Sequence, residues 1–186
     1  MKKIFLIAAM ALLPLAGFAQ KFAHVNLTEL VQLMPEMDEA RTVMSASEAD
    51  ANETYNAMVE EFQTKYQTYQ QKGSTWTQAI RESKEKELTD IQQRIQEFSQ
   101  SIQNELQQQQ QQLMAPIYKK AQDTVNDLAQ KGGYIYVIDI NSALYIDPAQ
   151  SVDLTPEART ILGIAEGRTL ESLQQELQAQ AQAHQQ

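Results

Sequence analysis

Hydrophobic residues recur at helical spacing along most of this chain. Between Met37 and Lys131 they follow one another mostly at intervals of three and four, which place side chains on one face of an α-helix. The stripe comprises Tyr55, Met58, Val59, Phe62, Tyr66 and Tyr69, then Leu88, Ile91, Ile95, Phe98, Ile102 and Leu106, and finally Leu113, Ile117, Ala121, Val125 and Leu128. Gln, Glu and Lys fill the other positions, a pattern typical of helices packed along a narrow seam.

The periodic stretch is interrupted once, near residues 72–75. Gly73 suits the end of one helix, and Ser74 or Thr75 suits the N-cap of the next. One apolar stripe cannot be buried by an isolated helix, so the two halves are expected to fold back on each other. The sequence therefore predicts a long antiparallel helical hairpin over residues 36–131, with arms of roughly 60 Å at 1.5 Å per residue.

Short extended segments flank the hairpin. Residues 22–26 precede it, and residues 134–140, rich in β-branched and aromatic side chains, follow Gly132 and Gly133. Asn141 and Ser142 then predict a tight turn into a further strand over residues 143–146. The strands come from opposite ends of the chain, so we expect the base of the hairpin to bring them together in a small sheet.

A closing helix is predicted from Thr155, which offers a capping hydroxyl before Pro156 and an acidic residue in the first turn. Residues 20–35 and 132–164 are thereby assigned to a β-containing body. The predicted fold class is mostly α with a small β body: a helical hairpin, a coiled-coil tentacle, standing on a short-stranded sheet.

The N-terminus has the pattern of a secretion signal. Lys2 and Lys3 precede an apolar run over residues 4–15, and small residues at Gly17 and Ala19 suit a cleavage site. The run is shorter than the roughly 20 residues that span a bilayer. A buried core helix is the alternative, but the order of basic, apolar and small residues favours a signal peptide over residues 1–19. We expect a mature chain that is exported and soluble.

Charge and composition exclude several functions. Without Lys2 and Lys3 the chain has 13 Lys and Arg against 24 Asp and Glu, a formal charge of −11, which argues against nucleic acid as a partner. There is no cysteine, and the two histidines, His24 and His184, are far apart in the sequence. No phosphate-binding glycine loop or calcium-loop spacing of acids is present. The sequence predicts no catalytic residues, no metal site, no cofactor and no enzyme activity.

The order of these elements resembles the Skp (OmpH-like) family of chaperones. The resemblance covers about residues 22–164 and depends on the segment Phe22–Asn26, the hairpin, the segment from Tyr134 to Asp139 and the closing helix at Thr155. It implies a homotrimer in the periplasm, in which the strands form a trimeric body and the hairpins surround a cavity. It also implies that unfolded outer-membrane β-barrel proteins are held in this cavity without ATP.

Two sets of residues follow from the resemblance and the pattern together. The residues expected to mediate oligomerisation are Phe22, Val25, Tyr134, Tyr136, Val137 and Ile138. The aromatic residues expected to contact an apolar client are Tyr55, Tyr66, Tyr69 and Trp76. Aromatic residues of a two-helix hairpin also fill its seam, and this alternative stays open for them. Tyr69 and Trp76 lie near the turn, where a thin structure has little interior, so exposure is expected there.

Two features depart from the family pattern. Family members are basic whereas this chain is acidic, yet residues 63–86 at the predicted tip have a local charge of +3, from Lys65, Lys72, Arg81, Lys84 and Lys86 against Glu82 and Glu85. A solvated helix face explains this charge, and transient contact with an anionic membrane surface or acidic client segments is the alternative. Residues 165–186 form a Gln-rich C-terminal extension, with one weak leucine stripe and predicted disorder from Gln178.

Two other functions compete with a chaperone. A structural or adaptor coiled coil of the cell envelope would share the leader and the hairpin but would not need the terminal strands. An envelope enzyme would need a reactive side chain that this inventory lacks. The predicted strands therefore favour an ATP-independent holdase over the coiled coil, and the residue inventory argues against the enzyme.

Overall fold

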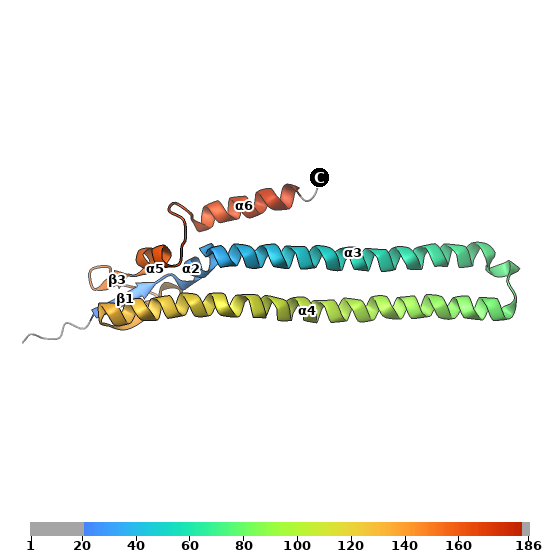
Figure 1. The fold of residues 1–186 in the computed structure, drawn as a ribbon, viewed down its shortest axis with the longest axis horizontal. Helices are drawn as coiled ribbons and strands as arrows, with labels where there is room; N and C mark the ends of the chain where they lie inside the picture. Colours follow the sequence, from blue (N-terminus) through green and yellow to red (C-terminus); the bar gives the residue numbers. More distant parts are fainter. Residues whose placement is uncertain (1–20, 184–186) are drawn as a thin grey trace, which may run out of the picture.

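The computed structural model of this protein describes residues 21–183. The predicted signal peptide over residues 1–19 and His184 lie outside the described residues. The described chain is a long rod made of two helices that lie side by side, with a small body at one end (Figure 1). None of the helices within residues 21–183 is both long and apolar enough to cross a membrane. The predicted fold class is confirmed.

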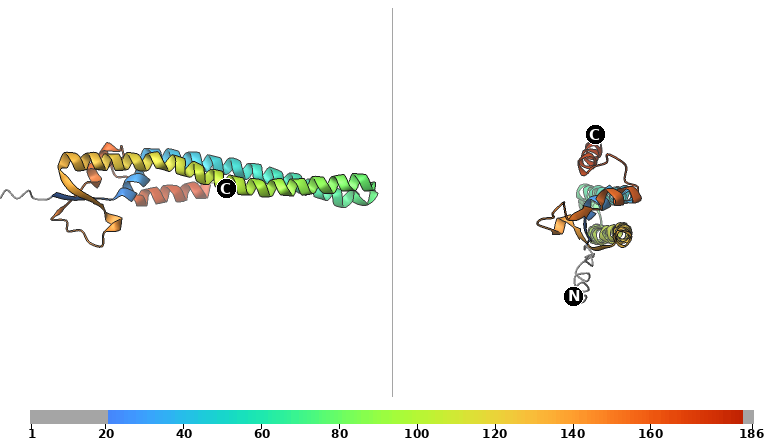
Figure 2. Two further views of the ribbon diagram at one scale, coloured as in Figure 1. Left: turned by 90° about the horizontal axis from the view of Figure 1, so that it is seen from below. Right: turned by 90° about the vertical axis from the view of Figure 1, so that its left-hand side faces the viewer.

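The hairpin consists of α3 (Pro35–Lys72) and α4 (Gln78–Gly132), which lie against each other along their length (Figures 1 and 2). They are joined by a 3₁₀ turn, Gly73–Thr75. Ser74 and Thr75, predicted as caps, lie in this turn, and the N-cap of α4 is Thr77, whose hydroxyl accepts the N–H of Ile80. A single 3₁₀ turn therefore reverses the chain, and the N-cap of the second helix comes two residues later than Thr75.

The sheet has three parallel strands in the order β2-β1-β3. These strands are β1 (Lys21–Val25), β2 (Tyr134–Asp139) and β3 (Ser151–Asp153). Because β1 precedes the hairpin and the other two follow it, the hairpin acts as the crossover connection that parallel strands require. In the register Ala23 faces Val137 on one side and Val152 on the other.

The predicted strand over residues 143–146 is wrong. Residues 140–142 form a 3₁₀ turn, and residues 143–150 run as an irregular loop in which Leu144 and Tyr145 are exposed. The segment has β-forming residues, but it pairs with neither of the two edge strands, β2 and β3, within the described residues. The third strand is instead the short polar segment Ser151–Asp153, which carries no strand pattern.

The core lies in the body, where short helices cover the sheet and the root of the hairpin. α2 (Leu27–Leu33) starts at Asn26, whose side chain accepts the N–H of Glu29. α5 is the predicted closing helix, Thr155–Ile161. The buried cluster comprises Ala23, Val25, Leu30, Val31, Leu33, Met34, Ala40, Ile117, Ala121, Val125, Leu128, Leu154, Ala158, Leu162, Ile164 and Leu173.

Thr155 does not cap its own helix as predicted. Its hydroxyl accepts the backbone N–H of Asn26 at 2.9 Å, and its own N–H donates to Asp153. The N-cap position of α5 is Leu154, which makes no side-chain cap hydrogen bond. Thr155 thereby connects the end of β1 to the start of α5, two segments that are 129 residues apart.

The C-terminal extension is more ordered than the sequence indicates. α6 (Leu170–Ala183) continues through the segment that we expected to be disordered from Gln178, and residues 184–186 are outside the described part. Leu173 is buried in the body core, so the extension packs on the body. The boundary drawn after Ile164 therefore separates two segments that share one core.

Candidate interaction surfaces

The tip of the hairpin is capped by two of the predicted aromatic residues. The rings of Tyr69 and Trp76 meet edge to face with centroids 6.0 Å apart, and both side chains are half-buried. The Tyr69 hydroxyl donates to the Glu85 carboxylate, which raises the pKa of Tyr69. Gly73 lies beneath the Tyr69 ring, where an added Cβ would be in van der Waals contact at 3.9 Å. Tyr69 and Trp76 therefore close the turn and still present part of their rings to solvent.

The other two predicted aromatic residues lie apart from the tip. Tyr55 and Tyr66 are 40% and 44% exposed on α3. Tyr66 stacks on Phe62 of the same helix, with ring centroids 5.8 Å apart. Tyr55 is about 20 Å from Tyr69 along the helix at 1.5 Å per residue. The four aromatic residues are spread along one arm and its turn and do not form a single patch.

The five basic residues near the tip are mostly paired. Lys65 donates to Glu87, Lys84 donates to Glu87 at 2.8 Å, and Lys86 donates to Asp90 at 2.6 Å. Within residues 21–183, Lys72 and Arg81 have no acidic partner, and the Arg81 Nε donates to the carbonyl of Gly73. The local charge of +3 was counted over residues 63–86, a window that ends one residue before Glu87. The pairing favours the interpretation of this region as a solvated helix face.

Glu87 is the centre of this charge cluster. Hydrogen bonds from Lys65 and Lys84 lower the pKa of Glu87 from 4.5 to about 2. The same contact with Glu87 raises the pKa of Lys65. The Lys65–Glu87 pair joins α3 to α4, as does the pair between Arg94 and Glu61 at 3.3 Å. These cations therefore hold the two arms together near the tip.

The predicted oligomerisation residues divide into two groups. Val25 is buried in the chain's own core, and Tyr134 and Val137 pack against that core. Tyr136 and Ile138 are exposed on β2, and the half-buried Phe22 ring stacks on Tyr136 with centroids 6.3 Å apart. Only the second group offers an apolar surface to another chain.

Sequence reasoning missed further exposed apolar residues around the sheet, of which Val152 is in register with Ala23 and Val137 and therefore lies on the face opposite to Tyr136 and Ile138. Ile135 is exposed on β2, Leu144 and Tyr145 are exposed in the loop that follows, and Val152 is exposed on β3. Both outer strands of the sheet have a free edge within the described residues, since only β1 is paired on both sides. An apolar sheet margin with open strand edges is prone to pair with a further chain. The β-forming run at residues 143–146 was a signal for this surface, although it predicted a strand.

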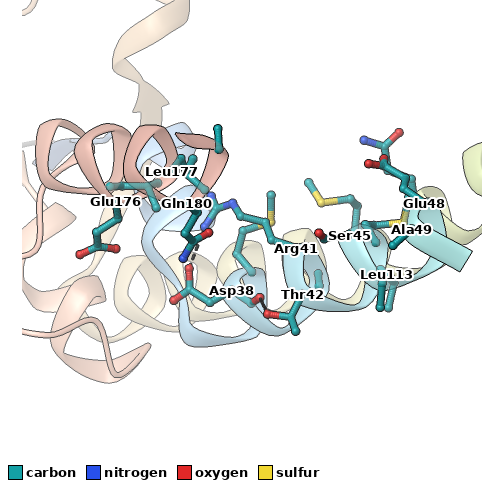
Figure 3. Close-up of a pocket in the computed structure, with 18 of the residues that line it drawn as sticks. Asp38, Arg41, Thr42, Ser45, Glu48, Ala49, Leu113, Glu176, Leu177 and Gln180 are labelled. Carbon is teal, nitrogen blue, oxygen red and sulfur yellow. Dashed lines mark hydrogen bonds and ion pairs between the residues drawn. The ribbon is translucent and has the colours of Figure 1, made fainter. Parts of the chain in front are cut away.

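A groove at the root of the hairpin was not predicted at all. It encloses about 840 Å³ between α6 and the two arms (Figure 3). Its apolar lining includes Met37, Ala40, Met44, Leu113, Met114, Leu173 and Leu177. No local pattern indicated that α6 pairs with the arms, because their contacts join residues that are about 130 positions apart.

The described residues form no metal centre, since no three of their His, Asp or Glu side chains are grouped closely enough to hold a metal ion. His24 lies in the body, with its Nδ1 at 2.8 Å from the Ser151 hydroxyl. That contact joins β1 to β3 and gives His24 a structural role in the sheet.

Comparison with known proteins places this architecture in a family. The family model for outer membrane protein (OmpH-like) matches residues 21–162. The chaperone protein Skp of Yersinia enterocolitica is 31% identical over 135 residues, which cover 72% of this chain and 82% of the relative. The chaperone protein Skp of Pectobacterium atrosepticum is 26% identical over 134 residues, which cover 72% and 81%.

A solved structure agrees with the same assignment. The crystal structure of an OmpH-like outer membrane chaperone from Caulobacter crescentus superposes with a TM-score of 0.69 at 14% identity, covering 77% of this chain and 83% of that one. At this identity the likeness shows the fold alone. α6 begins after the end of the family match at residue 162. The chain belongs to the OmpH-like family, whose curated relatives are named as Skp chaperones rather than as enzymes.

Proposed function

We propose that this protein is a periplasmic holdase chaperone. Three copies assemble through their bodies, and the hairpins surround a cavity that holds unfolded outer-membrane β-barrel proteins without ATP. The observation that carries the proposal is the apolar surface exposed around β2, since it leaves a single chain incomplete at the end where the arms begin. The number of copies comes from the family resemblance.

Assembly through the body follows from the chemistry of that surface. Tyr136, Ile138 and Leu144 are large apolar side chains exposed beside an open strand edge. Large apolar side chains exposed beside an open strand edge favour association, because burying apolar surface contributes about 25 cal/mol per Å². Joining the bodies would cover this surface and direct the arms of all copies to one side.

Assembly is tested by placing a charge on the exposed face. Ile138→Asp should shift the mature protein from three times the chain mass to the chain mass in light scattering, because a carboxylate cannot be buried without a partner. Ile161→Asp is the matched control, since Ile161 is also exposed but lies on α5. A clean monomer of the wild-type protein at micromolar concentration would refute the assembly.

Client holding needs only weak and non-directional contacts. Half-exposed aromatic residues along α3 and at the tip provide apolar surface that unfolded chains of many sequences can touch. Three of the five basic residues near the tip are paired with acidic residues, which reduces the net attraction at long range. We therefore expect holding to depend mainly on apolar contact, with a small dependence on salt.

The decisive experiment dilutes a urea-unfolded outer-membrane β-barrel protein into buffer with the chaperone present. Aggregation, followed by light scattering, should be suppressed at about one oligomer per client with no nucleotide. Tyr66→Ser with Trp76→Ser should weaken the suppression at every salt concentration. Tyr118→Ser is the matched control, because Tyr118 is 43% exposed but lies near the root of α4. If several β-barrel clients aggregate unhindered, a structural or adaptor coiled coil of the envelope becomes the better account.

A further inference from the structure

α6 is fixed firmly at its first turn. The guanidinium of Arg168, just before the helix, donates to both carboxylate oxygens of Asp38 on α3, at 2.6 and 2.7 Å. Thr169 and Ser172 exchange hydrogen bonds that cap the helix: the Ser172 N–H donates to the Thr169 hydroxyl, and the Thr169 N–H donates to the Ser172 hydroxyl. Leu173 then enters the body core at 5% exposure.

The rest of α6 is held weakly. Leu177 reaches the groove but is 41% exposed, and every residue from Gln174 to Ala183 is exposed to solvent. After Leu177 the sequence alternates Gln and Ala and offers no large apolar side chain. A groove of about 840 Å³ lies between this part of the helix and the arms. Because the groove is open to solvent and these residues are exposed, this part of α6 is not closely packed against the arms.

The surface beneath α6 is apolar and adaptable. It is formed by Met37, Ala40 and Met44 of α3 with Leu113 and Met114 of α4. Methionine side chains are flexible and polarisable, which suits a surface that accepts segments of different shape. α6 shows what such a surface accepts, because it presents Leu173, Leu177 and Ala181 at successive intervals of four.

The junction before α6 is irregular and is anchored to the body. Residues 162–169 contain two glycines with positive φ, Gly163 at 72° and Gly167 at 77°, while Leu162 and Ile164 lie in the body core and Arg159 donates to the carbonyl of Arg168. A 14-residue helix has little stability of its own in water, so α6 depends on its contacts with the body. The part of α6 beyond Leu173 is loosely packed, so it can be displaced without unfolding the core.

We propose that α6 is a displaceable strap over the Met-rich surface at the root of the hairpin, and that an apolar segment of an unfolded client takes its place there. The second half of this proposal rests on the proposed chaperone function. Without a client, α6 covers the Met-rich surface. When a client binds, its apolar segment displaces α6, so that the root of each arm contributes to client binding.

The test uses the absence of cysteine from the whole sequence. Ser45→Cys on α3 and Ala181→Cys on α6 both lie in the groove lining, so bifunctional thiol reagents of graded length are used to join them across it. The joined protein should bind less of an apolar fluorescent dye and capture clients more weakly than the same variant with each thiol blocked singly. A product of twice the chain mass would show that α6 reaches a second copy, which overturns the strap.

Release of the strap is the complementary measurement. Arg168→Gln removes the ion pair with Asp38, and Leu177→Ala weakens the distal contact, so each variant should bind more dye. Leu170→Ala is the matched control, because Leu170 is on the same helix but does not line the groove. If the strap is closed in about nine molecules of ten, its release tightens the apparent Kd for a client about tenfold.

The outcomes separate this proposal from the chaperone function. Unchanged dye binding in both release variants, with α6 helicity retained in circular dichroism, overturns the strap whatever the clients do. Increased dye binding with unchanged client capture overturns the role of the surface in holding. If the wild-type protein fails to hold any client, the chaperone function fails, while dye binding still decides whether α6 covers the surface.

Discussion

The root and the outer part of the hairpin are built from the same two helices, yet they are stabilised differently. At the root, Ile117, Ala121, Val125 and Leu128 of α4 are all buried against the body. In the outer part of both arms, beyond Leu113, Ile91 is the only large side chain that the structure buries fully within its described residues. A region with few buried apolar contacts opens at lower free energy than a packed core.

Polar contacts replace the core along the outer arms. Six consecutive glutamines at 107–112 interrupt the apolar stripe, and Gln109 reaches across the seam to the Ser47 hydroxyl at 3.0 Å. Nearer the tip, Lys65–Glu87 and Arg94–Glu61 connect the helices. Exposed ion pairs contribute little each, so the body fixes the fold and the arms retain freedom to bend.

The largest expected effect on stability comes from truncating a buried side chain in the body core. Leu30 is fully buried, and Leu30→Ala should lower the free energy of unfolding by about 2–5 kcal/mol. The same change at Leu106, which is half-buried in the arm, should cost only about 1 kcal/mol. Denaturant unfolding followed by circular dichroism measures both. An equal loss of unfolding free energy in the two variants would show that the root and the arm unfold as one unit, which contradicts the difference between them described above.

A smaller effect is expected from removing α6. The sequence led us to expect that cutting after Ile164 leaves the melting temperature unchanged, but Leu173 packs in the core. Its loss should cost about 2 kcal/mol, and the melting temperature should fall by about 4–8 °C. The control is a cut after Leu177, where each removed residue that the structure describes, 178–183, is exposed, so this cut should have almost no effect. A large loss from that shorter cut would mean that the distal part of α6 is firmly packed.

The smallest effect concerns the ion pairs of the arm. The pKa of Glu87 is about 2 in the folded protein, lower than its ordinary value of 4.5. The stabilisation that the ionised Glu87 gives the folded state is therefore complete above pH 4.5 and is lost as the pH falls from 4.5 to about 2. Because the pair is exposed, Glu87→Gln should cost only about 0.5 kcal/mol at neutral pH in denaturant unfolding. The difference from the wild type should vanish near the lower pKa.

A control distinguishes this pairing from a general loss of charge. Glu82→Gln removes a carboxylate whose hydrogen bond is from Gln78, a neutral side chain of the same helix. The free energy of unfolding of this Glu82→Gln variant should equal that of the wild type over the same pH range. If both variants behave alike, the specific contact of Lys65 and Lys84 with Glu87 contributes nothing measurable.

Local patterns in the sequence predicted the elements that form from neighbouring residues. The apolar stripe at spacings of three and four predicted both arms, with aromatic residues, Met and Val in the first arm and mostly Leu and Ile in the second, and Gly73 marked the turn. The run from Tyr134 to Ile138 predicted β2, because β-branched and aromatic residues follow one another there. Each of these signals lies within one element and needs no knowledge of the rest of the chain.

Contacts between distant segments could not be predicted in this way. Ser151–Asp153 becomes a strand because β1 has a free edge beside it, and nothing in those three residues indicates that role. Arg168 and Asp38 are 130 positions apart, so their pair, and the packing of α6 that accompanies it, leaves no local pattern. The lysines near the tip were counted as an excess of positive charge because their partners lie on the facing arm or beyond the counted window.

The central place of β1 in the sheet fixes an order of events during folding. β1 is synthesised first, but both of its neighbours are made only after α3 and α4. The contact between His24 and Ser151 spans 127 positions, and closing such a loop is slow unless it is shortened first. Pairing of α3 with α4 shortens the loop between β1 and the later strands, so we expect the seam between the arms to form before any strand pairs. Until its C-terminal residues arrive, the nascent chain carries an unpaired apolar strand and itself risks aggregation.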